Sequence, residues 1–148
     1  MRRAPREGGR GNNVEEVVMD IDEMLELARN CLDAWNTQDV DRVASCYTDD
    51  VVYADPNTRG VINGSDHFRR YLGKLFEAWE MTWALKEGFL FEGGNGCAML
   101  WHATIARPGG SKVLEFDGMD LVLVRGRLIE RNEVYFDRIA LMELLQAA

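Results

Sequence analysis

Two aspartates stand where their neighbours in the sequence are apolar, and they are the first candidates for chemistry. Asp55 follows the strand-like run Val51–Tyr53, and Asp120 interrupts the apolar stretch Met119–Val124. A buried carboxylate is unfavourable unless it is paired, and burial raises the pKa of a carboxyl toward the neutral range that a proton-transfer group needs. Asp55 and Asp120 are therefore candidate proton-transfer residues.

Each of these carboxylates also has a purely structural interpretation. Asp55 precedes Pro56 and Asn57, a composition typical of an Asx turn. Asp120 lies close to Gly118, where a β-bulge or a structural ion pair would account for a polar residue. Both interpretations stay open at this point.

A third carboxylate stands near the end of the chain. Glu133 and Arg131 alternate with Ile129 and Tyr135 on one side of the last predicted strand. If that side faces the interior, Glu133 joins the candidate site and Arg131 orients substrate or water beside it. If it faces solvent, the two form a surface ion pair worth only about 0–1 kcal/mol.

Other chemistries have little support. His67 and His102 lie far apart in the sequence and have no second ligand at helical spacing, so we expect no metal ion. Cys31, Cys46 and Cys97 share no close spacing, so we expect neither a redox motif nor a disulfide framework. Isolated cysteines are usually buried apolar residues, which fits a reducing, cytoplasmic protein.

The composition restricts the partners. The chain has 148 residues, 47% of them apolar, and a formal net charge of −8, which argues against binding nucleic acid. It has no apolar run of about 18 residues, so we expect no membrane span. Residues 1–13 carry four arginines and almost nothing apolar, so we expect a disordered basic arm there and one domain over residues 14–148.

Apolar periodicity predicts helices first and strands afterwards. Steps of three and four residues indicate a long helix from residue 14 to 35, and caps at Asp39 and Gly64 begin two more. Alternating stretches then indicate strands near residues 82–91, 97–106, 112–124 and 127–136, and Asp137 caps a last helix. Short turns between these strands predict an antiparallel sheet with helices on one face, the α+β class.

The third long strand is apolar on both sides. Two sets of residues alternate along it, Phe116, Val122 and Val124 on one side and Met119, Leu121 and Leu123 on the other. In an antiparallel sheet with one face exposed to solvent, apolar and polar residues alternate along each strand. Because this strand is apolar on both sides, the second face must also be shielded from solvent. We therefore expect a homodimer through the sheet.

Several short motifs, spread over residues 20–145, carry a family resemblance. They are Trp35-Asn36-x-x-Asp39-x-Asp41, Tyr47-x-Asp49-Asp50-Val51-x-Tyr53-x-Asp55-Pro56, Gly64, Gly118-x-Asp120, Gly126-Arg127-Leu128-Ile129-Glu130 and Tyr135-Phe136-Asp137. In this order they resemble the SnoaL-like branch of the nuclear transport factor 2-like superfamily. The resemblance implies a cone, in which N-terminal helices pack on the concave face of a strongly curved antiparallel or mixed sheet around an internal pocket.

The resemblance also implies roles for single residues. In ketosteroid isomerase-like members the position of Asp55 holds a general base and that of Asp120 a proton donor to a developing oxyanion, while the family's oxyanion-binding tyrosine falls at Cys31. Polyketide cyclase-like members use an acid near Asp120 for ring closure. In limonene epoxide hydrolase-like members, Tyr53, Asp55 and Glu133 match the positions that hold the attacking water.

We therefore predict a cofactor-independent isomerase or cyclase that acts on an apolar or polycyclic substrate in the internal pocket. The residues expected to line that pocket are Trp35, Phe76, Met99, Trp101 and Tyr135, together with Arg131. Two alternatives remain, an epoxide hydrolase-like water addition that uses Tyr53, Asp55 and Glu133, and a non-catalytic ligand-binding or dimerisation module of the same fold.

Overall fold

The computed structural model describes residues 18–146; the predicted arm 1–13 and residues 14–17 lie outside this range. Four helices and six strands follow one another within it. They are α1 (Ile21–Asn36), α2 (Val40–Ala44), β1 (Tyr47–Ala54), β2 (Ile62–Asn63), α3 (Ser65–Ala78), β3 (Glu80–Leu90), β4 (Gly96–Ala106), β5 (Val113–Arg125), β6 (Leu128–Tyr135) and α4 (Arg138–Gln146). None of these helices is long and apolar enough to cross a membrane.

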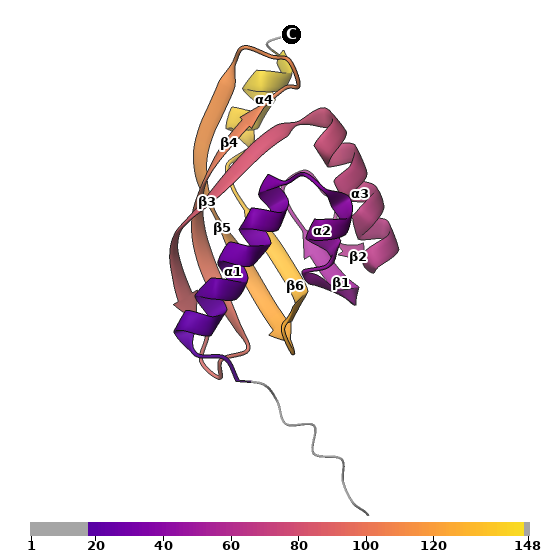
Figure 1. Ribbon diagram of the computed structural model, residues 1–148. Helices are drawn as coiled ribbons and strands as arrows, with labels where there is room; N and C mark the ends of the chain where they lie inside the picture. Colours follow the sequence, from indigo (N-terminus) through magenta and orange to yellow (C-terminus); the bar gives the residue numbers. More distant parts are fainter. Residues whose placement is uncertain (1–17, 147–148) are drawn as a thin grey trace, which may run out of the picture.

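The six strands form one curved, open sheet in the order β2-β1-β6-β5-β4-β3. β1 runs parallel to β6 and the other neighbours are antiparallel, so the sheet is mixed. Figure 1 shows the sheet bending around α1, α2 and α3, which lie on its concave side. The predicted α+β class and the cone that the resemblance implied are confirmed.

Polar caps set where the helices begin. Asp20 accepts a hydrogen bond of 2.9 Å from the backbone N–H of Glu23, so α1 begins at Ile21 and not at the predicted residue 14. Asp39 caps α2 and Asp137 caps α4 in the same way, as predicted. α1, α2 and α4 thus start at side chains that satisfy their first free N–H groups, whereas α3 follows Gly64 without a side-chain cap.

α4 closes one end of the cone. Its residues Leu141 and Leu144 are buried against Met81 of β3 and Ile105 of β4, in a second apolar cluster beside the main core. The main core lies between α1, α3 and the sheet, and it includes the fully buried Phe68 of α3. The space enclosed by the helices is therefore bounded at this end by a helix from the far end of the chain.

A β-bulge in β6 changes which side chains face inward. Glu130 is an extra residue between Ile129 and Arg131, with no partner in β5. A bulge reverses the side on which the following residues point. Ile129 is buried, and beyond the bulge Asn132 and Val134 face inward while Arg131 is exposed. The prediction that Arg131 shares a side with Ile129 is therefore wrong.

Gly118 makes room for a large neighbour. It pairs with Trp101 of β4, whose indole is completely buried. A Cβ at position 118 would lie 2.6 Å from Cζ2 of Trp101 and 2.8 Å from the backbone oxygen of Tyr135. Both distances are much shorter than a van der Waals contact, so only glycine fits without moving the indole or the strand.

We expect Gly118→Ala to destabilise the domain by about 1–3 kcal/mol, because the added methyl group overpacks a filled core. Gly73 of α3 is a matched control, since a Cβ there meets nothing within 4 Å. Gly73→Ala should stabilise the helix by about 0.5–1 kcal/mol. Urea denaturation measures both effects, and a Gly118→Ala variant as stable as the wild type would contradict the packing argument.

No helix within residues 18–146 covers the convex face of the sheet (Figure 1). Leu100, Leu121 and Leu123 are half-buried there, and the side chains of Phe89 and Met119 are 50% and 39% exposed. The helices all lie on the other side (Figure 1). A homodimer through this face stays a prediction.

Light scattering tests the predicted homodimer, since a dimer has twice the chain mass of 16.8 kDa. Leu121→Lys places a charge in the middle of the apolar face and should shift the particle toward the monomer. Val61→Lys, at an exposed position just before β2, should leave the mass unchanged. A wild-type monomer at micromolar concentration would refute the dimer.

Candidate functional site

The concave side of the sheet and the helices enclose a mainly apolar pocket. Its lining residues are Cys31, Leu32, Trp35, Tyr53, Asp55, Asn57, Leu75, Met81, Trp83, Met99, Trp101, Ile105, Phe116, Asp120, Asn132, Val134, Phe136 and Leu141. The space free of atoms is about 600 Å³ when its mouth to solvent is counted, but the free interior measures only about 40 Å³. That volume is enough for only a few water molecules. A large ligand would enter only if the walls moved.

Asp120 is the buried carboxyl of this pocket. Its side chain is held by two donors on the neighbouring strands, Trp101 Nε1 at 2.8 Å from Oδ1 and Asn132 Nδ2 at 3.1 Å from Oδ2. Burial raises the pKa of Asp120 to about 6, although both hydrogen bonds lower it, and the negative charge of Asp55 adds to the rise. Both protonation states of Asp120 are therefore accessible near neutral pH.

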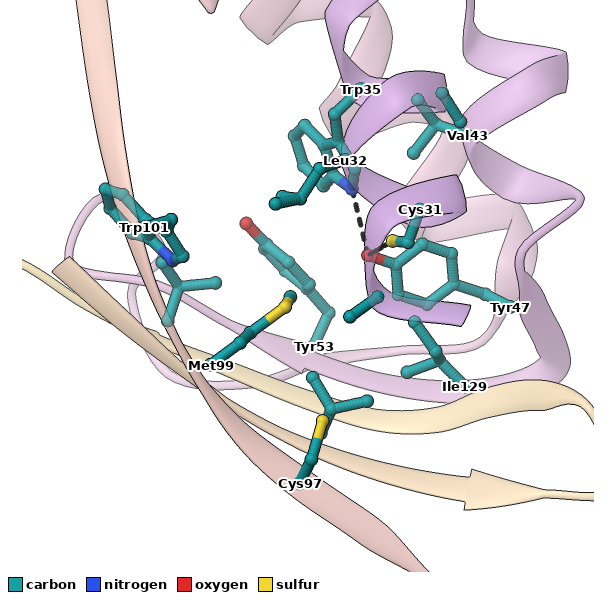
Figure 2. Close-up of a cluster of buried hydrophobic side chains, with 14 of the residues drawn as sticks. Cys31, Leu32, Trp35, Val43, Tyr47, Tyr53, Cys97, Met99, Trp101 and Ile129 are labelled. Carbon is teal, nitrogen blue, oxygen red and sulfur yellow. Dashed lines mark hydrogen bonds between the residues drawn. The ribbon is translucent and has the colours of Figure 1, made fainter. Parts of the chain in front are cut away.

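A chain of hydrogen bonds orients Asn132 behind this carboxyl. The Tyr47 hydroxyl donates to Asn132 Oδ1 at 2.9 Å and accepts from Trp35 Nε1 at 3.0 Å. The Cys31 sulfur lies 3.6 Å from the same hydroxyl, as Figure 2 shows. Because Tyr47 has one proton to donate, it fixes the Asn132 carbonyl on its own side. The Asn132 amide N–H is thereby directed at Asp120.

Asp55 lies in the same pocket, with both of its oxygens occupied. Oδ1 accepts the backbone N–H groups of Asn57 at 2.6 Å and Thr58 at 3.0 Å, the Asx-turn arrangement. Oδ2 accepts the hydroxyls of Tyr53, at 2.9 Å, and Tyr71. Burial, followed by the charge of Asp55, raises the pKa of both tyrosines, so both hydroxyls stay protonated. The turn interpretation and the pocket interpretation of Asp55 both describe part of its environment.

Residues 28–132 match the family model of the SnoaL-like domain, which is more than half of the chain. The chain belongs to the SnoaL-like family. No curated protein sequence matches it closely enough to add a relative.

Solved structures share the fold of this SnoaL-like domain. A protein from Jannaschia sp. CCS1 described as a SnoaL-like polyketide cyclase has a TM-score of 0.72 at 15% identity, covering 95% of this chain and 99% of that one. The epoxide hydrolase/cyclase-like enzyme SalBIII, described with a role in pyran ring formation in polyether salinomycin, has a TM-score of 0.72 at 18% identity, with coverages of 82% and 95%. TerC co-crystallised with polyporic acid also has a TM-score of 0.72 at 18% identity, with coverages of 84% and 98%. At these identities the likeness shows the fold alone.

Three of the predicted residues lie on the convex face of the SnoaL-like domain, outside the pocket. Arg131 donates to Glu133 from Nε at 3.0 Å and from Nη2 at 2.6 Å, and the Tyr135 hydroxyl donates to Glu133 at 2.7 Å. All three lie on the convex face, because the bulge at Glu130 turns them outward. The surface-pair interpretation of Glu133 is therefore correct. The water-holding set of Tyr53, Asp55 and Glu133 is not assembled.

The aromatic lining follows the prediction in part. Trp35, Met99 and Trp101 line the pocket as expected, whereas Phe76 lies behind the wall, edge-on to Trp35 with 5.8 Å between ring centroids. Phe136 takes the lining position predicted for its neighbour Tyr135, again because of the bulge.

Sequence reasoning missed Trp83 and Asn132. Trp83 alternates with Met81 and Leu85 on β3, a period of two that would have placed it beside Met81 on the inner face. Its indole N–H is buried and has no acceptor within residues 18–146. Trp83 is thus a donor available to a ligand. Asn132 had no comparable signal, because its inward direction depends on the bulge.

The lining includes two charged residues, Asp55 and Asp120. Across the part of the chain that the structure describes, no three His, Cys, Asp or Glu side chains group as a metal site would require. The chemistry that the described residues themselves offer is proton transfer by a carboxyl, assisted by hydroxyl and indole donors.

Replacing Asp120 with Asn should change how the stability of the domain depends on pH. The pKa of about 6 in the folded state lies above the roughly 3.9 of an unfolded aspartate, so between these values only the folded state keeps the proton. The stabilising contribution of this group is complete below about pH 4 and is lost as the pH rises through about 6. The advantage of wild type over Asp120→Asn should therefore fall by about 3 kcal/mol between pH 3 and 8, at about 1.4 kcal/mol per pKa unit.

Asp117 of β5 supplies a control of opposite sign. It lies on the convex face, and its hydrogen bonds with Lys86 and then His102 lower its pKa. The advantage of wild type over Asp117→Asn should therefore rise with pH. Urea denaturation at several pH values measures both series, and an Asp120→Asn curve parallel to that of the wild type would contradict the raised pKa.

Proposed function

We propose that this SnoaL-like domain is a cofactor-independent enzyme that moves a proton on a small, largely apolar substrate in its internal pocket, as an isomerase or a cyclase. One observation carries the proposal: the carboxyl of Asp120 is 5% exposed, lines the pocket, and has a pKa raised to about 6 by burial. A carboxyl in this range exchanges a proton with carbon acids far more readily at neutral pH than a strong acid does.

The hydrogen bonds favour a division of roles in which Asp120 is the base. Asp55 accepts four hydrogen bonds and has no oxygen left for a substrate proton, so it serves to orient Tyr53. The Tyr53 hydroxyl lies between Leu32 and Trp101 in Figure 2. In this arrangement Asp120 removes a proton from the carbon next to a carbonyl, while Tyr53 positions the substrate.

Removal of this proton leaves an electron pair whose negative charge must be stabilised. These electrons pass from the broken C–H bond to the carbonyl oxygen, where the developing negative charge requires donors. Trp83 offers a buried N–H without an acceptor among the described residues, whereas the Tyr53 hydroxyl already donates its one proton to Asp55. Asp120 then returns the proton to another carbon in an isomerisation, or the enolate carbon attacks an electrophilic carbon of the same substrate in a cyclisation.

The size of the interior favours a second candidate, a non-catalytic module that binds a small molecule. With about 40 Å³ free, well below the roughly 300 Å³ at the low end of ligand pockets, even a compact ring requires the walls to move, and a polycyclic substrate requires a larger movement. The two candidates differ in whether a bound carbonyl compound turns over.

Hydrogen–deuterium exchange tests the proposal. Cyclohexanone and cyclopentenone in D₂O should lose their protons beside the carbonyl, followed by NMR, at least about 10²-fold faster with wild type than with Asp120→Asn. Glu133→Gln is the matched control, because that carboxylate lies on the convex face, and it should keep the wild-type rate. If Asp120 is the base, the rate rises through about pH 6 to a plateau; if it is the acid, the rate falls above pH 6.

Two other results would contradict the enzyme. Chemical-shift changes that show ketone binding, with no exchange beyond that of Asp120→Asn, would establish the binding module. Incorporation of labelled water oxygen into a small epoxide, without ketone exchange, would establish water addition.

A further inference from the structure

A groove on the outside of the domain brings two of the three cysteines together. Cys31 belongs to α1, and Cys46 stands between α2 and β1. The residues that line the groove are Glu23, Glu26, Leu27, Asn30, Cys31, Ser45, Cys46, Arg127 and Leu128. No pattern in the sequence indicates this pair, because the two cysteines are brought to one groove by the packing of α1 against α2. The expectation that the cysteines are buried holds for Cys31 and Cys97, whereas Cys46 is half-buried.

The surroundings of Cys46 favour its ionised form. Its side chain is half-buried, and its S–H donates to the backbone oxygen of Arg42 at 3.6 Å. The neighbouring Cys31 thiol is the largest cause that lowers the pKa of Cys46 to about 7, against desolvation, with help from Ser45 and the positive charge of Arg42. The thiolate is the nucleophilic form of cysteine, so about half of Cys46 is reactive at pH 7.

The third cysteine, Cys97, is fully buried and is held in its protonated thiol form. Cys97 of β4 lies in the core with no exposed surface, and burial followed by the charge of Asp120 raises its pKa to about 11. It provides an internal reference for the reactivity of Cys46 in the same molecule.

Cys31 connects the outer groove with the pocket. It lines both, and its sulfur lies 3.6 Å from the Tyr47 hydroxyl (Figure 2). Tyr47 in turn donates to Asn132, whose amide donates to Asp120. A change at the Cys31 sulfur therefore reaches the candidate catalytic carboxyl through two hydrogen-bonded side chains.

We propose that Cys46 and Cys31 form a redox-active dithiol that responds to peroxides. The Cys46 thiolate attacks one peroxide oxygen, the O–O bond breaks, and hydroxide leaves and is protonated to water, which leaves a sulfenic acid on Cys46. The Cys31 thiol then attacks the Cys46 sulfur, a second water leaves, and a disulfide closes. Two thiols and one hydrogen peroxide become one disulfide and two waters. Formation of the disulfide moves the Cys31 sulfur away from the Tyr47 hydroxyl. This weakens the hydrogen-bonded chain that orients Asn132, and the effect does not depend on which reaction the pocket performs.

Alkylation of the native protein is the first test and needs no variant. Iodoacetamide at pH 7 should label Cys46 at least about 10-fold faster than Cys97, because the rate follows the thiolate fraction. Trypsin separates the sites, since Arg29, Arg42 and Arg59 place Cys31 and Cys46 in different peptides. Equal labelling rates for Cys46 and Cys97 would overturn the proposal.

Oxidation is the second test. One equivalent of hydrogen peroxide should join the peptides of Cys31 and Cys46, with a mass two hydrogens below their sum. In Cys31→Ala the sulfenic acid of Cys46 should persist and be trapped by dimedone, and the alkylation of Cys46 at pH 7 should slow about 10-fold, because the neighbouring thiol that lowers its pKa is removed. Cys97→Ala should behave as the wild type does. A wild-type protein that gives as much dimedone adduct as Cys31→Ala, and no linked peptide, would show that the two cysteines do not act as a pair.

Discussion

The pocket depends on the burial of one carboxyl group, that of Asp120. A carboxyl without partners would be strongly unfavourable inside an aromatic cavity, so the strand on each side of β5 supplies one donor. Trp101 comes from β4 and Asn132 from β6, and each binds a different oxygen. Since both donors must reach the same group, the register of three adjacent strands is tied to this single carboxyl. The group that holds the sheet in register is also the one best suited to proton transfer.

Gly118 explains how Trp101 reaches that carboxyl. Trp101 pairs with Gly118 across the two strands, while its N–H binds Asp120 two residues further along β5. The indole therefore passes over Gly118, where a side chain would block it. The Gly118-x-Asp120 motif thus has a physical meaning: the glycine gives the indole its path, and the indole N–H partly satisfies the buried acid.

A residue could be placed from the sequence only where the pattern that marks it lies in its immediate neighbours along the chain. Asp120 stands out because it interrupts an apolar strand, and Asp39 and Asp137 mark helix starts because capping involves adjacent residues. Asn132 could not be placed, since one extra residue at Glu130 reverses the alternation of β6, and bulges leave no reliable local pattern.

One polar group of the pocket, the Trp83 N–H, has no partner among the described residues, and this affects which ligands would fit the pocket. Most of its polar groups satisfy one another, but the Trp83 N–H is buried without an acceptor among the described residues, an arrangement that costs about 1–3 kcal/mol. A ligand that places an oxygen acceptor at this N–H recovers that energy, and a pure hydrocarbon does not. With so little free interior, the ligand that we propose is a compact apolar ring that carries a carbonyl or hydroxyl oxygen. Such a molecule brings the atom whose developing charge Trp83 would stabilise into the pocket of Asp120.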